Sequence, residues 1–207
     1  MTDAVRLAPH PDRDTAAPRH LLRAATRSAH DRVDAAFGAF DMATAEGYRR
    51  FLSAHQAVLP PLERSLAASS VEDHLADWPS RCRSEALAAD LRDLGIDASA
   101  DGGEAPVAAF SPAEVMGALY VLEGSRLGGA ILARHVGAAA DPRCRTATRY
   151  LLHGEGERLW PSFVSYFNAS DVVRHSLPEV IAAARHTFSL FETAARDVAA
   201  RFPEDNR

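Results

Sequence analysis

The sequence predicts an all-α protein. Apolar residues recur at three- and four-residue steps in most segments, which is the spacing that forms one face of a helix. No segment shows the sustained alternation and β-branched enrichment of a strand, and no repeat of fixed length occurs. A length of 207 residues suits one domain with a sizeable core. We expect about seven helices in a single domain over residues 18–207, after a loose arm over residues 1–17.

Composition and charge argue against several classes of function. The formal net charge is −5, which does not favour nucleic-acid binding, and all 23 basic residues are arginine. No apolar run approaches the roughly 18 residues of a membrane span, and the N-terminus lacks a signal-peptide core. Cys82 and Cys144 lie far apart and outside any C-x-x-C motif, which indicates a reducing compartment and no zinc site. We expect a cytoplasmic protein that binds neither nucleic acid nor a membrane.

Residues 21–37 predict an amphipathic helix that carries the first candidate site. Its apolar face consists of residues at three- and four-residue steps, namely Leu22, Thr26, Ala29, Val33 and Phe37. His30 borders this face. At roughly 100° per residue, Arg23, Arg27 and Asp34 fall within about 60° of it on the helix surface. One strip of the helix therefore carries an imidazole, a carboxylate and two guanidiniums.

This strip has the residue types that hold an iron-containing ligand with carboxylate groups. A neutral imidazole such as that of His30 binds iron well, and its other N–H needs an acceptor, which Asp34 could supply directly or through water. The guanidiniums of Arg23 and Arg27 could clamp two carboxylates of the same ligand. The alternative is that the histidine borders the core and the charges form a solvated helix edge.

Other side chains are weaker candidates for an iron ligand. His10 has no helical context, and His20 falls in the fraying first turn of the helix. His55 lies on the apolar side of the second predicted helix, where we expect a hydrogen-bonded core residue. A thiolate ligand from Cys82 or Cys144 has no supporting motif.

The middle of the chain predicts two more helices and a loop. Thr44 can cap a helix that runs to about residue 66, and Pro60–Pro61 should kink or split it. Another helix over residues 83–94 ends at Gly95. Residues 96–110 contain the Gly, Asp and Pro residues typical of a loop.

Residues 111–136 predict a long helix with an unusual number of glycines. Ser111 and Glu114 have the spacing of a capping box. The glycines lie on or beside one face, at Gly117, Gly124, Gly128 and Gly129. Each interior glycine costs about 1 kcal/mol relative to alanine, so the absence of side chains must bring a gain. That gain is either close approach of the backbone to a flat ligand or tight crossing of a neighbouring helix.

The last part of the chain predicts three helices. Asp141–Pro142 begins one that runs to about residue 152, and residues 153–157 form a turn. Residues 159–167 concentrate aromatic side chains, which suits core packing or the wall of a pocket. Residues 178–202 form the last helix.

Two of these stretches resemble one family. The segment LRAATRSAHDRVD over residues 22–34 is similar to the proximal-helix motif of the haem oxygenases, and YVLEGSRLGG over residues 120–129 is similar to their glycine-rich distal helix. AARHTFSLFETA over residues 183–194 resembles their last long helix less specifically. The E-G-S-x-L-G motif is most similar to that of the bacterial branch, some members of which supply bilin to phytochromes. The resemblance implies a haem-oxygenase-like helical bundle with haem between the first helix and the glycine-rich helix.

Carried across by position, the resemblance assigns roles to the strip on the first helix. His30 matches the proximal iron ligand. Arg23 and Arg27 match basic positions that meet the haem propionates. Asp34 matches an acidic position near the proximal histidine.

The same comparison assigns roles on the glycine-rich helix and exposes one departure. Gly124, Gly128 and Gly129 match glycines that let backbone lie over the macrocycle. Many members carry an aspartate directly after the first of these glycines, where this chain has Ser125 followed by Arg126. A serine can order a water but holds no negative charge. Gly124 and Ser125 are the candidate catalytic positions, with proton delivery through backbone or water.

The resemblance implies a haem oxygenase that converts haem to biliverdin, iron and carbon monoxide. Haem b would be substrate and cofactor together, with dioxygen and an electron donor such as a reductase, ferredoxin or ascorbate. The biliverdin could pass to a phytochrome. The main alternative is a non-catalytic haem-binding sensor or carrier with the same fold. A helical thiamin-degrading enzyme is a further alternative that would require a nucleophilic cysteine.

Overall fold

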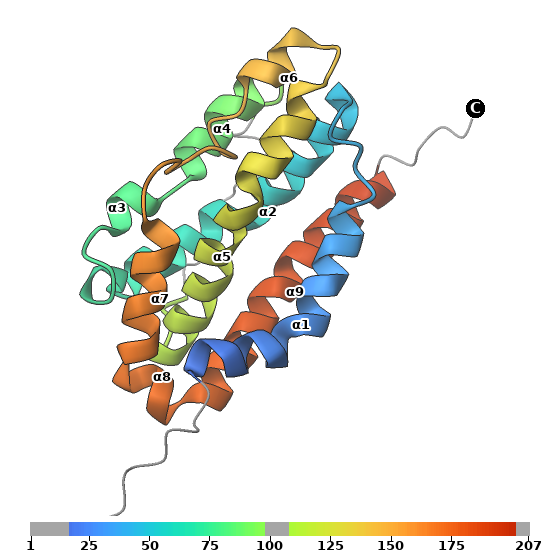
Figure 1. Cartoon of the computed structure of the whole chain (residues 1–207). Helices are drawn as coiled ribbons and strands as arrows, with labels where there is room; N and C mark the ends of the chain where they lie inside the picture. The colour runs from blue at the N-terminus through green and yellow to red at the C-terminus, as the bar shows by residue number, and fades with distance from the viewer. Residues whose placement is uncertain (1–16, 98–107, 202–207) are drawn as a thin grey trace, which may run out of the picture.

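The computed structural model describes residues 17–97 and 108–201, and within these ranges it contains helices and no strand (Figure 1). The all-α prediction is confirmed. The predicted arm over residues 1–17 lies, except for its last residue, outside the described ranges. The helices are α1 (Pro18–Phe37), α2 (Ala45–Ala68), η1 (Val71–Asp73), α3 (Trp78–Arg81), α4 (Ser84–Asp93), α5 (Pro112–Gly137), α6 (Pro142–Thr146), α7 (Leu159–Ala169), α8 (Asp171–His175) and α9 (Leu177–Arg201).

Helix α9 lies at the centre of the packing. It contacts α1, α2 and α5, and Figure 1 shows α1 and α9 side by side. Helix α1 also contacts α7 near its start. The packing on α9 and α7 holds α1 in place, and a cavity lies between α1 and α5.

Helix α1 begins three residues before the predicted start because Pro18 occupies its first turn, where a proline needs no N–H partner. The buried side chains are Leu22, Thr26 and Ala29. The predicted apolar face is therefore the face that packs on the core, and it leaves the polar strip beside it outside the core.

Helix α2 excludes one of the two expected effects of its prolines, which were to kink or to split it. Pro60 and Pro61 lie inside a single assigned helix of 24 residues, so they do not split it. Buried apolar side chains precede and follow the prolines, at Val58, Leu59, Leu62 and Leu66. Their burial on both sides of the pair outweighs the local loss of backbone hydrogen bonds.

Helix α5 forms as predicted. The Ser111 hydroxyl accepts from the Glu114 N–H at 3.3 Å, and the Ser111 N–H donates to the Glu114 carboxylate at 2.7 Å, which completes the capping box. By length and composition α5 could cross a membrane. However, half of its most apolar stretch of 18 residues is buried in the protein, as in a core helix.

The prediction of a helix from Pro142 to about residue 152 is wrong beyond its first turn. Helix α6 ends at Thr146, and the chain continues without regular structure to Arg158. The buried carboxylate of Asp90 accepts the Tyr150 N–H at 2.8 Å, and the Tyr48 hydroxyl donates to the Ala147 carbonyl at 2.5 Å. These two long-range bonds hold the backbone of this loop.

We expect Gly117→Ala to lower the free energy of unfolding by about 1–2 kcal/mol, measured by urea denaturation. A Cβ at Gly117 would lie 2.6 Å from the Ala183 Cβ and 2.7 Å from the Val180 carbonyl oxygen of α9. The control is Gly137→Ala at the end of the same helix, where a Cβ meets nothing within 4 Å. It should leave stability unchanged or raise it by less than about 1 kcal/mol. Equal effects of the two changes would contradict the close α5–α9 crossing.

Candidate functional site

A cavity of about 1580 Å³ lies between α1 and α5. Its other walls come from α2, α7, α9 and the loop between α6 and α7. Every residue that the sequence singled out for the site lines this cavity, namely Arg23, Arg27, His30, Asp34, Gly124, Ser125, Gly128 and Gly129. The structure thus brings the two candidate stretches together around one space.

His30 is fixed at one nitrogen and accessible at the other. Its Nδ1 lies 3.0 Å from the Asp34 Oδ2 one helical turn on, and its ring meets Phe188 of α9 edge-on at 5.7 Å between centroids. The side chain is 59% exposed, so it is not a core residue. In a neutral imidazole held this way, Nδ1 donates to the carboxylate and Nε2 presents its lone pair.

The first half of α1 forms a basic edge of the cavity. Arg19, Arg23 and Arg27 line it, and within the described residues the structure records no ion pair or hydrogen bond for the side chains of Arg23 and Arg27. The lining residues further along the same helix include Asp31 and Asp34. A ligand with carboxylates is therefore attracted to the end where Arg23 and Arg27 lie.

The three glycines of the α5 wall differ in what surrounds them. A Cβ at Gly128 would meet nothing within 4 Å, and one at Gly124 would lie 3.6 Å from the Trp160 ring. A Cβ at Gly129 would overlap the Leu151 carbonyl oxygen. Gly124 and Gly128 leave backbone open to the cavity, whereas Gly129 also allows the loop to pack on the helix. Tight crossing, the alternative reading of the glycines, is correct at Gly117.

Ser125 is engaged by its surroundings. Its hydroxyl donates to the Leu122 carbonyl at 2.8 Å and accepts from the Arg83 Nη2 at 2.9 Å. The Arg83 guanidinium also donates to the Leu122 carbonyl and lies 5.1 Å from the centre of the Tyr150 ring. The Ser125 hydroxyl therefore donates to the helix backbone and accepts from a guanidinium.

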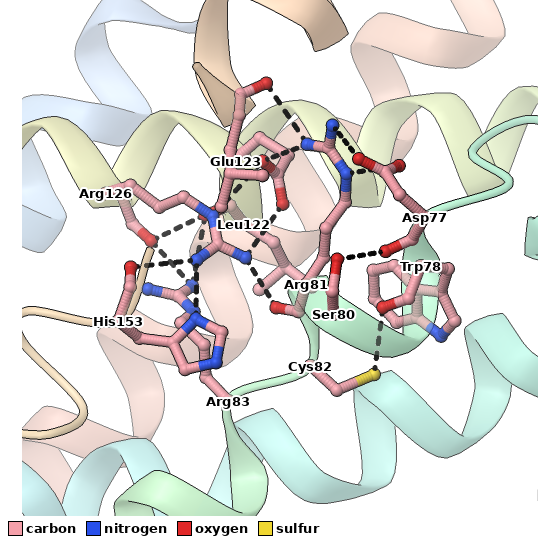
Figure 2. Close-up of polar contacts among 12 residues, drawn as sticks. Asp77, Trp78, Ser80, Arg81, Cys82, Arg83, Leu122, Glu123, Arg126 and His153 are labelled. Atoms are coloured by element: carbon pink, nitrogen blue, oxygen red, sulfur yellow. Dashed lines mark hydrogen bonds and ion pairs between the residues drawn. The ribbon is translucent and has the colours of Figure 1, made fainter. Parts of the chain in front are cut away.

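A buried charge network lies behind the α5 wall (Figure 2). The Glu123 carboxylate is fully buried and pairs with the Arg81 Nη1 at 2.7 Å and the Arg126 Nη2 at 3.0 Å. The Arg81 guanidinium also donates to both Asp77 oxygens, and these hydrogen bonds lower the pKa of the Asp77 carboxyl. Charges this deep are tolerated only when paired and hydrogen-bonded.

The same network reaches the loop after α6. The Arg126 Nη1 lies 3.3 Å from the His153 Nδ1 and donates to the His153 carbonyl at 3.4 Å. His153 lines the cavity. Arg83, Glu123 and His153 were not predicted from the sequence as site residues. Glu123 alone carried a local signal, because it is an acidic residue within an apolar helix.

His55 is a hydrogen-bonded core residue, as predicted, and it also lines the cavity. Its Nδ1 donates to the Phe51 carbonyl at 2.8 Å, and aromatic rings surround it, including those of Phe37, Tyr150 and Phe191. Burial lowers the pKa of His55 from 6.5 to about 4. The imidazole is therefore neutral at physiological pH.

Three of the alternative ligands, His20, Cys82 and Cys144, do not line this cavity. His10 lies outside the described residues, and His20 does not line the cavity. Burial raises the pKa of the Cys82 thiol to about 12, and Cys144 is fully buried. Neither cysteine lines the cavity or has the lowered pKa that a thiolate ligand or nucleophile needs.

The fold and the cavity define an α-helical protein with a large cavity between a histidine-bearing helix and a glycine-rich helix. A family model described as heme oxygenase matches residues 18–197. The heme oxygenase PigA of Pseudomonas aeruginosa is 32% identical over 157 residues, covering 73% of this chain and 77% of that protein. A heme oxygenase of Xanthomonas campestris is 32% identical over 152 residues, covering 72% and 88%. This chain belongs to the haem oxygenase family.

Solved structures agree on the fold. The NO- and CO-bound heme oxygenase from Neisseria meningitidis superposes with a TM-score of 0.75 at 24% identity, covering 90% of this chain and 94% of that one. The heme oxygenase from Leptospira interrogans gives a TM-score of 0.67 at 18% identity, covering 88% and 100%. At these identities the likeness concerns the fold.

We expect the free energy of unfolding to depend on pH because His55 is neutral in the folded protein. Its pKa is about 4 in the folded protein and about 6.5 in the unfolded chain. Between these values the unfolded state binds more protons, so the free energy of unfolding falls as the pH falls. The predicted loss from this group is about 2 kcal/mol between pH 7 and pH 5. His55→Gln, which keeps a donor but cannot titrate, should flatten the profile in urea titrations by that amount. Parallel profiles for the two proteins would contradict the assignment.

Proposed function

We propose that this chain cleaves haem oxidatively to biliverdin, iron and carbon monoxide, using dioxygen and electrons from an external donor. Family membership gives the activity class, a haem-degrading oxidoreductase. The single observation that carries the proposal for these residues is the cavity, which has an imidazole on one wall and open backbone opposite it. Its volume of about 1580 Å³ exceeds that of common small-ligand pockets, roughly 300–1,000 Å³, and suits a macrocycle.

His30 is the proposed iron ligand, bound through Nε2. The contact between Nδ1 and Asp34 fixes the ring and its tautomer, which raises the basicity of the ligating nitrogen. A neutral imidazole is a common axial ligand of haem iron and donates less strongly than a thiolate. Bound haem supplies both the iron that activates dioxygen and the ring that is oxidised.

Arg23 and Arg27 are the proposed partners of the haem propionates. Both guanidiniums face the cavity, and each can form a bidentate pair with a carboxylate. Two anchors on one edge would fix the rotation of the macrocycle about the iron axis. That rotation would determine which edge of the macrocycle faces the buried end of the cavity.

The glycines of α5 are proposed to crowd the open face of haem with backbone. Gly124 and Gly128 present no side chain, and Gly129 keeps the adjoining loop close to the helix. Ser125 would act beside them through its hydrogen bond from Arg83, which orients the guanidinium toward the cavity wall. Backbone this close to the open face of haem would restrict where a small ligand can lie. The polar groups of Ser125 and Arg83 would hold water beside it.

The external partners follow from the family resemblance alone. We propose a reductase, ferredoxin or ascorbate as electron donor, and a phytochrome as a recipient of the biliverdin. The two free cysteines suit a reducing compartment, so we place the reaction in the cytoplasm.

Haemin reconstitution tests the activity and the role of His30 together. We expect wild-type protein mixed with haemin to lose its Soret band and gain bilin absorbance when ascorbate or a reductase is added under air. His30→Ala should shift the ferric Soret band and abolish bilin formation. The matched control is His20→Ala, an exposed histidine of the same helix that does not line the cavity.

Two outcomes would count against this proposal. A stable oxygenated complex without bilin in the wild type would identify a sensor or carrier instead of an enzyme. A His30→Ala variant with unchanged spectrum and activity would remove His30 as the ligand.

We expect Arg23→Ala and Arg27→Ala each to weaken haemin binding by about tenfold, because each removes one charge-assisted contact worth roughly 1.5 kcal/mol. Fluorescence quenching measures this affinity. The control is Arg174→Ala on α8, outside the cavity. The dimethyl ester of haemin, which lacks carboxylates, should bind wild type and variants alike. A variant that still weakens the binding of the ester would show that the arginines act through packing.

A further inference from the structure

A second, smaller pocket adjoins this cavity and has no role in the proposed function. This pocket of about 290 Å³ lies between α5, the start of α7 and the loop over residues 151–157. The two spaces share a wall formed by Arg126, Leu127, Leu151, His153 and Trp160. Among these five residues, Arg126 and His153 are the two charged or titratable ones.

We infer that His153 carries protons from the second pocket to the α5 side of the haem cavity. The inference rests on the proposed function, which requires a proton supply at that wall. His153 acts through water and touches no substrate, so it is a positioning residue for proton transfer.

The position of His153 is set by several independent contacts. Asp90 accepts the Tyr150 N–H, and Arg126 donates to the carbonyl of His153 itself. Gly154 follows with φ of +74°, and a Cβ there would overlap the Leu159 side chain, so this turn requires glycine. A loop held this firmly keeps the imidazole at the shared wall.

The neighbours of His153 determine its tautomer. The Arg126 guanidinium can only donate, so the Nδ1 atom, 3.3 Å from Nη1, accepts in the neutral ring. The remaining proton is then on Nε2. Figure 2 shows the imidazole beside Arg126 and away from the Asp77 end of the network.

The other polar groups at this wall hold their protons in a hydrogen bond, at a raised pKa or as guanidiniums. The hydroxyl hydrogen of Ser125 is bonded to the Leu122 carbonyl, and burial raises the pKa of Tyr150. Guanidiniums such as those of Arg83 and Arg126 keep their protons at physiological pH. His135 also lines the main cavity but does not border the second pocket.

The charges around His153 favour release of a proton. Burial lowers the pKa of the imidazole, and the positive charges of Arg126 and Arg83 lower it further, while Glu63 and Glu157 act in the opposite sense. An imidazolium here would lie next to two guanidiniums and would be a ready donor. Glu155 and Glu157 line the second pocket and are exposed, so this pocket borders solvent.

Each transfer is balanced. The imidazole takes one proton from water in the second pocket at Nδ1, as its 3.3 Å contact with the Arg126 Nη1 opens, and it releases the Nε2 proton to water in the haem cavity. The ring is unchanged except for its tautomer, which exchange with water restores. No electron moves in this step.

His153→Gln tests the inference in the haemin-loaded protein. We expect haemin affinity within about twofold of wild type, because the backbone contact from Arg126 remains. Single-turnover bilin formation should slow by at least tenfold, in the range of lost acid–base assistance, and the rate should lose the part of its pH dependence that lies below the ordinary histidine pKa. The control His175→Gln changes an exposed histidine of α8 outside both spaces and should match wild type.

Two further measurements keep the inference falsifiable if His153→Gln misfolds. In the haem-free wild type, nitrogen-15 NMR should show His153 as the Nε2–H tautomer with a pKa below the ordinary histidine value. Ala130→Phe narrows the second pocket from a position that does not line the haem cavity, and it should also slow turnover.

The outcomes separate the two proposals. If the wild type forms bilin and His153→Gln does so within twofold, with the same pH profile, the relay is wrong and the enzyme stands. An Nδ1–H tautomer would also overturn the relay. A wild type that binds haemin without converting it overturns both.

Discussion

The fully buried carboxylate of Glu123 constrains the whole α5 side of the cavity. Its charge must be balanced inside the protein, and Arg81 and Arg126 do this from α3 and from α5 itself. Arg81 also donates to the Leu159 carbonyl, and Arg126 donates to the His153 carbonyl. One carboxylate thereby ties α3 and α5 to the middle of the loop between α6 and α7 and to the first residue of α7. Leaving one charge of such a group unpaired costs about 3–5 kcal/mol, so its members form one structural unit.

The local parts of the site could be predicted from the sequence. Arg23, Arg27, His30 and Asp34 share one helix, and helical periodicity alone places them on one strip. That strip needed a partner surface, which the glycine content of residues 111–136 indicated. The sequence could not show which glycine faces the ligand, because that depends on what packs against each one. Gly128 faces open space and Gly117 faces α9.

The parts that could not be predicted depend on contacts between distant segments. Arg83 meets Ser125 across 42 residues of sequence, and Arg81 meets Glu123 across the same separation. The Asp90 carboxylate accepts the Tyr150 N–H from 60 residues away in the sequence. This bond takes the Tyr150 N–H from the helix that local propensity favoured. Helix propensities and capping patterns carry no information about such pairs, and apart from Glu123 each partner resembles an ordinary surface residue in the sequence. The buried charges around α5 were therefore missed while its helix was found.

Ser125 holds no negative charge, so the charged groups beside it on the α5 wall are guanidiniums. Arg83 and Arg126 both reach this side of α5, whereas the carboxylates that accompany them, Glu63 and Glu123, are buried behind it. Guanidiniums orient water and attract anions but do not release protons near neutrality. A wall of this kind positions polar ligands without supplying acid. Any reaction here that consumes protons must draw them from a titratable neighbour, and that requirement gives the loop after α6 a chemical role beyond closing the cavity.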